Sequence, residues 1–208
     1  VAVEGNIGSG KTSLLKHFET CEQAKVYKEP TDRWRNIQGH NALALMYEDP
    51  ERWSLTFQTY VQLTMLQTHL AKQEQAVKLM ERSIHSAKYC FVENLHKGGV
   101  MPELEYIVLT RWFDHIIQNE DCSPDLIVYL QTNPEVLHER IRKRCRKEES
   151  GIPMDYLQDL HNLHEDWLIH QTHFSVPCPV LVLDANLELQ DMLNVCDQHR
   201  EKILCGHG

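Results

Sequence analysis

The sequence lacks a long hydrophobic run, an excess of basic residues and a paired cysteine motif. No apolar stretch approaches the roughly 20 residues of a membrane-spanning helix, so we expect no membrane insertion. The formal net charge is −9, and an acidic chain is poorly suited to neutralise nucleic acid phosphates. The seven cysteines include no C-x-x-C pair. This disfavours a disulfide framework or a zinc site and favours buried thiols in a reducing compartment.

Several functional motifs are also missing. Neither N-K-x-D nor D-x-x-G occurs, which disfavours a GTPase switch, and the glycines at 5, 8 and 10 do not fit the dinucleotide pattern G-x-G-x-x-G. The spacing of His161, His164, His170 and His173 differs from that of zincins, because Leu168 stands where the second histidine would be. We interpret these histidines as surface or core residues.

A glycine-rich loop stands at the start of the chain, between the apolar run Val1–Val3 and a predicted helix that opens with Ser13–Phe18. It fits G-x-x-x-x-G-K-[ST], the pattern of a P-loop whose backbone N–H groups, lysine and hydroxyl hold nucleotide phosphates and Mg²⁺. The dipole of the following helix favours anions at the same place. The predicted phosphate-binding residues are Gly5, Asn6, Ile7, Gly8, Ser9, Gly10, Lys11 and Thr12.

Strands alternate with helices along the whole chain, which indicates a mostly parallel sheet between two helical layers. With 208 residues we expect one α/β domain spanning 1–208. The predicted strands are 1–3, 24–28, 77–81, 126–130 and 180–183. The predicted helices include 42–47, one from the Asp49 cap and Pro50 to His69, 82–98, segments after Pro102, Pro134 and Pro153, and 187–203.

The first strand has only about three residues before the loop, fewer than the usual five or six. We therefore expect the natural protein to begin earlier, with any targeting peptide in the preceding segment. On the sequence alone, the compartment stays open between mitochondria and cytosol.

Four features outside the P-loop carry candidate chemistry. Glu29 follows a predicted strand. It could act as a general base near the phosphate site, or it could be an acidic residue exposed on a loop. Glu81 is a Mg²⁺ ligand or a solvated strand-end acid, and its neighbour Arg82 could orient Glu29. Gln58 could pair with a nucleobase edge or simply belong to an amphipathic helix. The arginines from 140 to 146 form a solvated helix face or a lid over the transferring phosphate, at about 140–151.

Six motifs together identify the chain as similar to the deoxyribonucleoside kinase family. They are E-G-N-I-G-S-G-K-T (4–12), E-P-x-x-x-W (29–34), L-M-Y (45–47), F-Q-T-Y-V (57–61), E-R-S (81–83) and the arginine segment ending in Glu148-Glu149. The stretches R-W-R-N, M-E-R-S-I-H-S-A and L-H-E-D-W-L-I resemble most the branch of mitochondrial thymidine kinases and insect multisubstrate kinases. The resemblance covers nearly the whole chain.

This resemblance implies a P-loop kinase fold with a five-stranded parallel sheet and transfer of the γ-phosphoryl group of ATP to a deoxynucleoside 5′-hydroxyl. Glu29 would be the base with Arg82 as its partner, and Lys11 would act with them. Thr12 and Glu81 would serve Mg²⁺. The implied lid cations are Arg142, Arg144 and Arg146. The implied substrate-binding residues are Glu29, Trp34, Met46, Tyr47, Phe57, Gln58, Val61, Met65, Arg82, Ala87, Phe91 and Glu149, with Tyr47 and Glu149 at the 3′-hydroxyl.

The resemblance also implies a homodimer and feedback inhibition by a deoxynucleoside triphosphate. Met65 and Ala87 stand where the deoxycytidine kinase branch has a charged pair, so we expect thymidine and deoxycytidine to be preferred over purine deoxynucleosides. A nucleoside monophosphate kinase of the thymidylate kinase type is the alternative enzyme, but Glu29 would repel an acceptor phosphate. A non-catalytic nucleotide-binding module is the alternative of another class.

Overall fold

The computed structural model describes residues 1–144 and 151–207, in which five strands form one parallel sheet. Across the sheet the strands are β2 (Ala24–Tyr27), β3 (Val77–Glu81), β1 (Ala2–Glu4), β4 (Ile127–Gln131) and β5 (Val180–Asp184). All five predicted strands are confirmed to within one residue at each end. In the centre, Val3 of β1 lies opposite Glu81 of β3 and Val128 of β4. The carboxyl ends of the strands share one edge, which is where open α/β sheets bind ligands.

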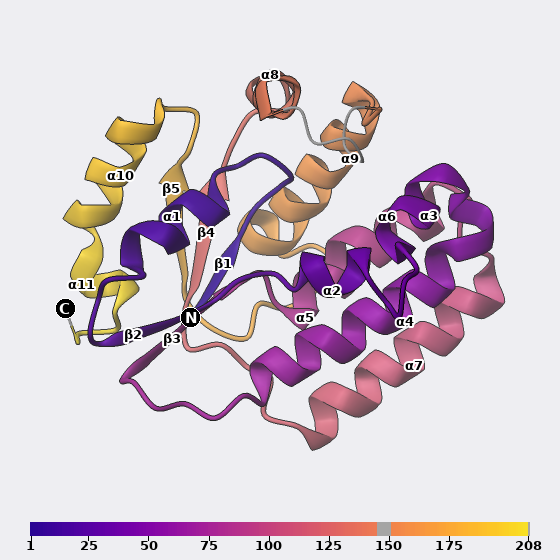
Figure 1. The fold of residues 1–208 in the computed structure, drawn as a ribbon, viewed down its shortest axis with the longest axis horizontal. Helices are drawn as coiled ribbons and strands as arrows, with labels where there is room; N and C mark the ends of the chain where they lie inside the picture. The colour runs from indigo at the N-terminus through magenta and orange to yellow at the C-terminus, as the bar shows by residue number, and fades with distance from the viewer. Residues whose placement is uncertain (145–150, 208) are drawn as a thin grey trace.

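Helices cover both faces of the sheet (Figure 1). One face carries α1 (Lys11–Phe18), α10 (Leu189–Gln198) and α11 (Arg200–Ile203). The other face carries the π-helix η1 (Ala87–Val92), α8 (Pro134–Arg144), α9 (Met154–Glu165) and the π-helix η3 (Asp166–His170). Two apolar cores fill the spaces between these layers, one around Leu14 and Phe18 and one around Tyr129 and Trp167. The predicted three-layer architecture is confirmed.

A further group of helices extends from the side of the sheet, where Figure 1 shows α4 and α7 lying side by side. It comprises α2 (Thr31–Arg35), α3 (Ala42–Glu48), α4 (Pro50–His69), α5 (Ile84–Ser86), α6 (Glu93–Lys97) and α7 (Glu103–Asn119). The start of α4 follows from local sequence, since the Asp49 side chain accepts a hydrogen bond from the Arg52 N–H and Pro50 takes the first helical position. This group surrounds its own apolar core, which includes Trp34 and Phe57.

The structure corrects three expectations. The helix predicted from Arg82 begins at Ile84, because Arg82 adopts a left-handed backbone with φ of 63° and Ser83 caps the helix instead. The single helix predicted over 187–203 is two helices, which meet at the non-helical His199. The cysteines are not all buried, since Cys205 is exposed and Cys178 is partly exposed.

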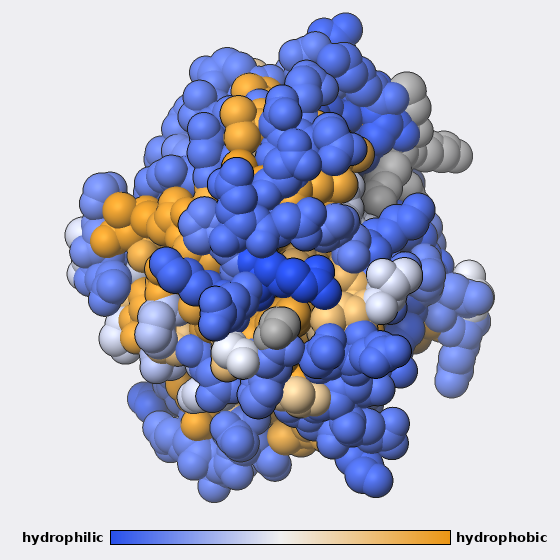
Figure 2. Space-filling view, turned by 90° about the vertical axis from the view of Figure 1, so that its left-hand side faces the viewer, coloured by the Kyte–Doolittle hydropathy of each residue, from blue (hydrophilic) through white to orange (hydrophobic). Residues whose placement is uncertain are grey.

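The histidines of α9 and the following segment lie as expected, with His164 in the core and His170 and His173 on the surface. In the described ranges, no helix is both long and apolar enough to cross a membrane. Figure 2 looks onto the side of the molecule that is on the left in Figure 1, where hydrophilic residues dominate and hydrophobic ones show between them.

Candidate active site

The P-loop connects β1 to α1 and wraps around the ammonium group of its own lysine. Lys11 Nζ donates hydrogen bonds to the carbonyl oxygens of Gly5, at 2.9 Å, and of Asn6, at 2.7 Å. Gly5 is required here, because its φ is 143° and a Cβ would stand 2.9 Å from the Leu130 oxygen. Burial, followed by the charge of Arg82, lowers the pKa of Lys11 to about 7. The loop thus holds the Lys11 amine at the N-terminus of α1, a position suited to phosphate, whose negative charge would favour the charged form of the lysine.

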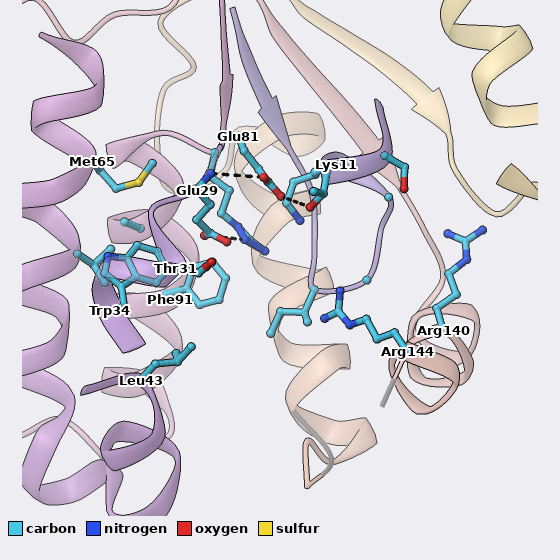
Figure 3. A pocket seen from close by; sticks show the side chains of 18 of the residues that line it. Lys11, Glu29, Thr31, Trp34, Leu43, Met65, Glu81, Phe91, Arg140 and Arg144 are labelled. Atoms are coloured by element: carbon cyan, nitrogen blue, oxygen red, sulfur yellow. Dashed lines mark hydrogen bonds and ion pairs between the residues drawn. The ribbon is translucent and has the colours of Figure 1, made fainter. Parts of the chain in front are cut away.

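The P-loop meets three residues at the carboxyl ends of β2 and β3: Glu81 ends β3, while Glu29 and Arg82 come after β2 and β3 (Figure 3). Thr12 Oγ1 donates a hydrogen bond of 2.6 Å to Glu81 Oε1, and the Glu29 backbone N–H donates one of 3.4 Å to Glu81 Oε2. Arg82 Nη1 donates to Glu29 Oε1 at 3.2 Å, and Nη2 donates to the Gly5 oxygen at 3.1 Å. Glu29, Glu81 and Arg82 are therefore connected by hydrogen bonds to one loop, although 52 residues separate Glu29 from Glu81.

The left-handed turn at Arg82 explains how two consecutive residues reach the same site. In an extended strand Glu81 and Arg82 would point to opposite faces, but Arg82 leaves the strand with φ of 63°. Burial disfavours the charge of the Arg82 guanidinium, and the carboxylates of Glu29, Glu4 and Glu81 outweigh this effect and raise its pKa. Arg82 is thus a permanent cation beside the Glu29 carboxylate.

A cavity of about 510 Å³ runs from the P-loop into the helical group beside the sheet, a volume suited to a small-molecule ligand. The end away from the P-loop is largely apolar. All the expected base-side residues that the structure describes line it: Trp34, Met46, Tyr47, Phe57, Gln58, Val61, Met65, Ala87 and Phe91. Figure 3 shows Trp34, Met65 and Phe91 on the side of the cavity opposite Arg140 and Arg144.

Packing holds the walls of the apolar end in place. Trp34 Nε1 donates a 2.9 Å hydrogen bond to Thr64 Oγ1, and the Trp34 ring meets that of Phe57 edge to face at 5.6 Å. The Arg82 guanidinium stands 4.7 Å from the centre of the Phe91 ring. The Gln58 side chain is buried, and its Oε1 has no hydrogen-bond partner among the described residues. A buried amide oxygen in an apolar cavity favours a ligand that donates a hydrogen bond to it.

Some of the predicted phosphate-binding and lid residues line the cavity and others do not. Ile7, Gly8, Gly10, Lys11 and Thr12 line the cavity, while Gly5, Asn6 and Ser9 support the loop from behind. On α8, Arg144 lines the cavity and Arg142 does not. Arg146 and Glu149 lie outside the described residues.

Several residues that line the cavity were not predicted as site residues from the sequence. Arg140 belongs to the basic run but was not among the predicted lid cations; it lines the cavity four residues before Arg144, on the same face of α8. Its guanidinium donates to the oxygens of Ala185, at 2.8 Å, and Leu187, at 2.6 Å, which ties α8 to the segment after β5. The i,i+4 spacing of the arginines was the available signal. Ser83 and Arg35 stand in the family motifs E-R-S and R-W-R-N but were given no role there. The other additions had no such signal: Ser13, Thr31, Leu43, Tyr156, Leu187, Glu188, Leu189 and Met192.

A family model and individual relatives both relate this chain to kinases of deoxynucleosides. The family model described as "Deoxynucleoside kinase" matches residues 1–205. The chain is 54% identical to "Thymidine kinase 2, mitochondrial" of Homo sapiens over 204 residues, which covers 98% of this chain and 77% of the relative. The same figures apply to the Macaca fascicularis protein of that name. The chain is 37% identical to "Deoxycytidine kinase" of Homo sapiens over 221 residues, covering 92% of this chain and 85% of the relative.

Proposed function

The chain belongs to the deoxynucleoside kinase family and is an ATP-dependent kinase of deoxynucleosides; on this basis we propose that it phosphorylates the 5′-hydroxyl of thymidine and deoxycytidine in preference to purine deoxynucleosides. The observation that carries this proposal is the position of the Glu29–Arg82 pair. It lies in one cavity between the P-loop cation Lys11 and the apolar end that contains Gln58. Relatives at 54% and 37% identity bear the names of thymidine and deoxycytidine kinases, which supports both pyrimidine substrates.

Glu29 is the proposed general base. A base in phosphoryl transfer must reach the proton of the attacking hydroxyl, and the Glu29 carboxylate lines the cavity where its two ends meet. The hydrogen bond from Arg82 fixes one carboxylate oxygen, Oε1, and a charged partner favours the ionised form of a carboxylate. Arg82 in turn is fixed by the Gly5 oxygen of the P-loop. The proposed base is thereby oriented relative to the phosphate site.

Thr12 and Glu81 are the proposed residues for Mg²⁺. Their hydroxyl and carboxylate oxygens lie 2.6 Å apart at the start of α1, and Mg²⁺ prefers oxygen ligands, often together with water and substrate phosphates. This donor set fits the ion. When bound, Mg²⁺ would neutralise charge on the β- and γ-phosphates of ATP.

The arginines of α8 are the proposed counter-charges for the transferring phosphoryl group. Arg144 lines the cavity next to the P-loop, and Arg140 fixes its helix to the segment after β5. Positive groups held in place where charge develops lower the barrier of the transfer. The proposal for Arg142 and Arg146 rests on the family resemblance, as does that for Tyr47 and Glu149 at the 3′-hydroxyl.

The apolar end supports the proposed preference for pyrimidines. Gln58 is its central polar group, and Met65 and Ala87 line it without adding charge. A glutamine amide offers both an acceptor and a donor to a base edge, so it can pair with thymine or cytosine. The adjacent apolar surface suits the methyl group of thymine.

The family resemblance also supports three proposals about assembly, feedback and location. Helices α4 and α7 expose large apolar residues, namely Leu63, Leu104, Ile107, Val108 and Trp112, and Leu70 directly after α4 is exposed as well. A second copy packing on these helices would bury them in a homodimer.

The cavity is continuous from the apolar end to the P-loop. A bound deoxynucleoside triphosphate would therefore block the binding of both the deoxynucleoside and ATP. The mitochondrial name of the relative favours a mitochondrial over a cytosolic location.

A deoxynucleoside panel tests the substrate proposal. Steady-state rates are measured with ATP and Mg²⁺ on thymidine, deoxycytidine, deoxyadenosine and deoxyguanosine. We expect the highest kcat/KM for the two pyrimidines. A clear preference for deoxyguanosine would refute the argument from Gln58, Met65 and Ala87.

A further inference from the structure

The π-helix η1 supplies two walls of the apolar end of the cavity, which is the proposed nucleoside site and is called the nucleoside end below. Ala87 and Phe91 both lie in this segment and both line the cavity. Phe91 also contacts the Arg82 guanidinium, at 4.7 Å from the ring centre. A π-helical turn contains one residue more than an α-helical turn, is intrinsically rare and occurs frequently at functional sites. Something must therefore hold this segment in the π-helical register.

Lys88 and Glu93 are joined twice across this turn. The Glu93 backbone N–H donates a hydrogen bond to the Lys88 carbonyl oxygen, which is the i→i+5 bond of a π-helix. The side chains of the same two residues form an ion pair between Lys88 Nζ and Glu93 Oε1. In an α-helix residues five apart point in different directions, since each residue turns the helix by about 100°. The side-chain pair thus matches the π-helical register and not the α-helical one.

A third residue completes this buried cluster from α7. Tyr106 Oη donates a 2.6 Å hydrogen bond to Glu93 Oε1 and accepts one of 3.3 Å from Lys88 Nζ. Lys88 Nζ also lies 4.4 Å from the centre of the Tyr106 ring. Lys88 and Glu93 are only 2% and 5% exposed, so both charges are shielded from water and paired with each other.

The energetics of such a pair favour a role in conformation over one in stability. Removing two charges from water costs about as much as their attraction returns, so a buried ion pair adds little net stability, and its best-attested use is to specify a register. Burial, together with the Glu93 hydrogen bond and charge, raises the pKa of the Tyr106 phenol. Tyr106 consequently remains a hydrogen-bond donor to Glu93 at neutral pH.

We propose that Lys88, Glu93 and Tyr106 are positioning residues that hold η1 in its π-helical register and thereby orient Ala87 and Phe91 toward the nucleoside. If the segment relaxed to an α-helix, the residues on one side of the turn would rotate by about 100° relative to the other. Ala87 and Phe91, four residues apart, would still share one helix face, but that face would be rotated relative to α6, which begins at Glu93, and would no longer be directed at the cavity. This inference rests on the proposed placement of the nucleoside beside Phe91.

The test is the double variant K88M/E93L, which replaces the pair by apolar residues of similar length. Such replacements are often neutral or stabilising, so we expect a melting temperature at least as high as that of the parent. We expect the KM for thymidine to rise about tenfold, a loss of about 1.4 kcal/mol of binding free energy, because displaced walls lose packing contacts with the nucleoside; the KM for ATP should be unchanged. The charge-reversed variant K88E/E93K should bring the thymidine KM back toward that of the parent.

A matched control uses another contact between α6 and α7, the pair of His96 and Glu103 at 2.7 Å. Only Glu103, the exposed partner, is changed, because His96 stacks on Tyr106. Glu103→Gln should leave both KM values unchanged. An unchanged thymidine KM in folded K88M/E93L, or an equal rise in both KM values, would overturn the proposal. If K88M/E93L yields no folded protein, Glu93→Gln decides by the same criterion. Phe91→Ala separates the two hypotheses: if it leaves the thymidine KM unchanged, the nucleoside placement itself is wrong.

Discussion

The two ends of the cavity are built in different ways. At the phosphate end, Gly5–Thr12 provides the loop, the buried lysine and the hydroxyl within eight consecutive residues. At the nucleoside end, Trp34, Gln58 and Phe91 come from α2, α4 and η1. The phosphate end is charged and hydrogen-bonded to its own backbone, whereas the nucleoside end is apolar with a single buried amide at its centre. Glu29 and Arg82 join the two ends.

This difference indicates a division of labour. Phosphates are alike in all nucleotides, so a contiguous loop with fixed backbone geometry can serve any of them. A nucleoside is recognised by shape and by a few polar groups, which requires walls from several elements. Changes at the phosphate end should therefore lower kcat for every deoxynucleoside, and changes at the nucleoside end should alter their ranking.

The largest expected effect is that of Glu29→Gln at the junction. Loss of general-base catalysis typically lowers kcat by about 10²- to 10⁴-fold, while the KM for thymidine should change little because the amide keeps the shape of the carboxylate. Steady-state kinetics at saturating ATP measure this, with the exposed Glu22→Gln as control. A Glu29→Gln enzyme with full activity would refute the role of general base.

At the phosphate end, Lys11→Met should lower kcat by about 10²- to 10³-fold, the usual cost of removing one group that stabilises developing charge. The loss should be the same for all deoxynucleosides, because the proposed ligand of this lysine is the phosphate chain of ATP, which is the same for every acceptor. Lys16→Met, on the exposed side of α1, is the matched control. A loss that depends on the nucleobase would contradict the division between the two ends.

At the nucleoside end, Gln58→Leu should lower kcat/KM for thymidine by roughly 10- to 100-fold, since the base would be buried without its hydrogen bonds. The KM for ATP should stay constant. Gln67 is an exposed glutamine of the same helix. The variant Gln67→Leu is the control and should leave kcat/KM for thymidine unchanged. An equal loss for both substrates would show that Gln58 supports the whole fold and does not read the base.

The smallest expected effect concerns two buried histidines, His69 at the end of α4 and His164 in α9. Burial is the main cause that lowers the pKa of His69 and of His164 from 6.5 to about 3. Below pH 6.5 the unfolded chain binds protons that the folded chain excludes, so stability falls as the pH drops toward 3. In this pH range each histidine should lower the free energy of unfolding by up to about 1.4 kcal/mol for each pH unit of acidification.

Urea unfolding at pH 7.0, 6.0 and 5.5 measures these slopes. His69 accepts a hydrogen bond from the Ile84 N–H at the start of the helix behind the nucleoside end, and His164 stacks on Tyr129 of β4. His69→Gln and His164→Gln should each flatten the pH dependence by the contribution of one proton. If neither variant changes the slope, both histidines titrate normally in the fold.

Much of the fold follows from local patterns in the sequence. Apolar runs between turn residues located all five strands, and Asp49-Pro50 located the start of α4. The left-handed turn at Arg82 and the break at His199 were not predicted. Arg82 would be expected to continue a strand or enter a helix; its contacts with Glu29, Gly5 and the Phe91 ring compensate for the strained backbone.

The sequence by itself determined the phosphate end, because a P-loop is a local structure whose binding groups are mostly its own backbone N–H groups. It also indicated Glu29 and Gln58 as candidates, although only the family resemblance, and no local pattern, assigned them to one site. Tertiary structure decided that, since parallel strands bring Glu29, Glu81 and Arg82 to one edge of the sheet. It also buried the Lys88–Glu93 pair against Tyr106 of α7, and specifying a register is the best-attested use of a buried ion pair.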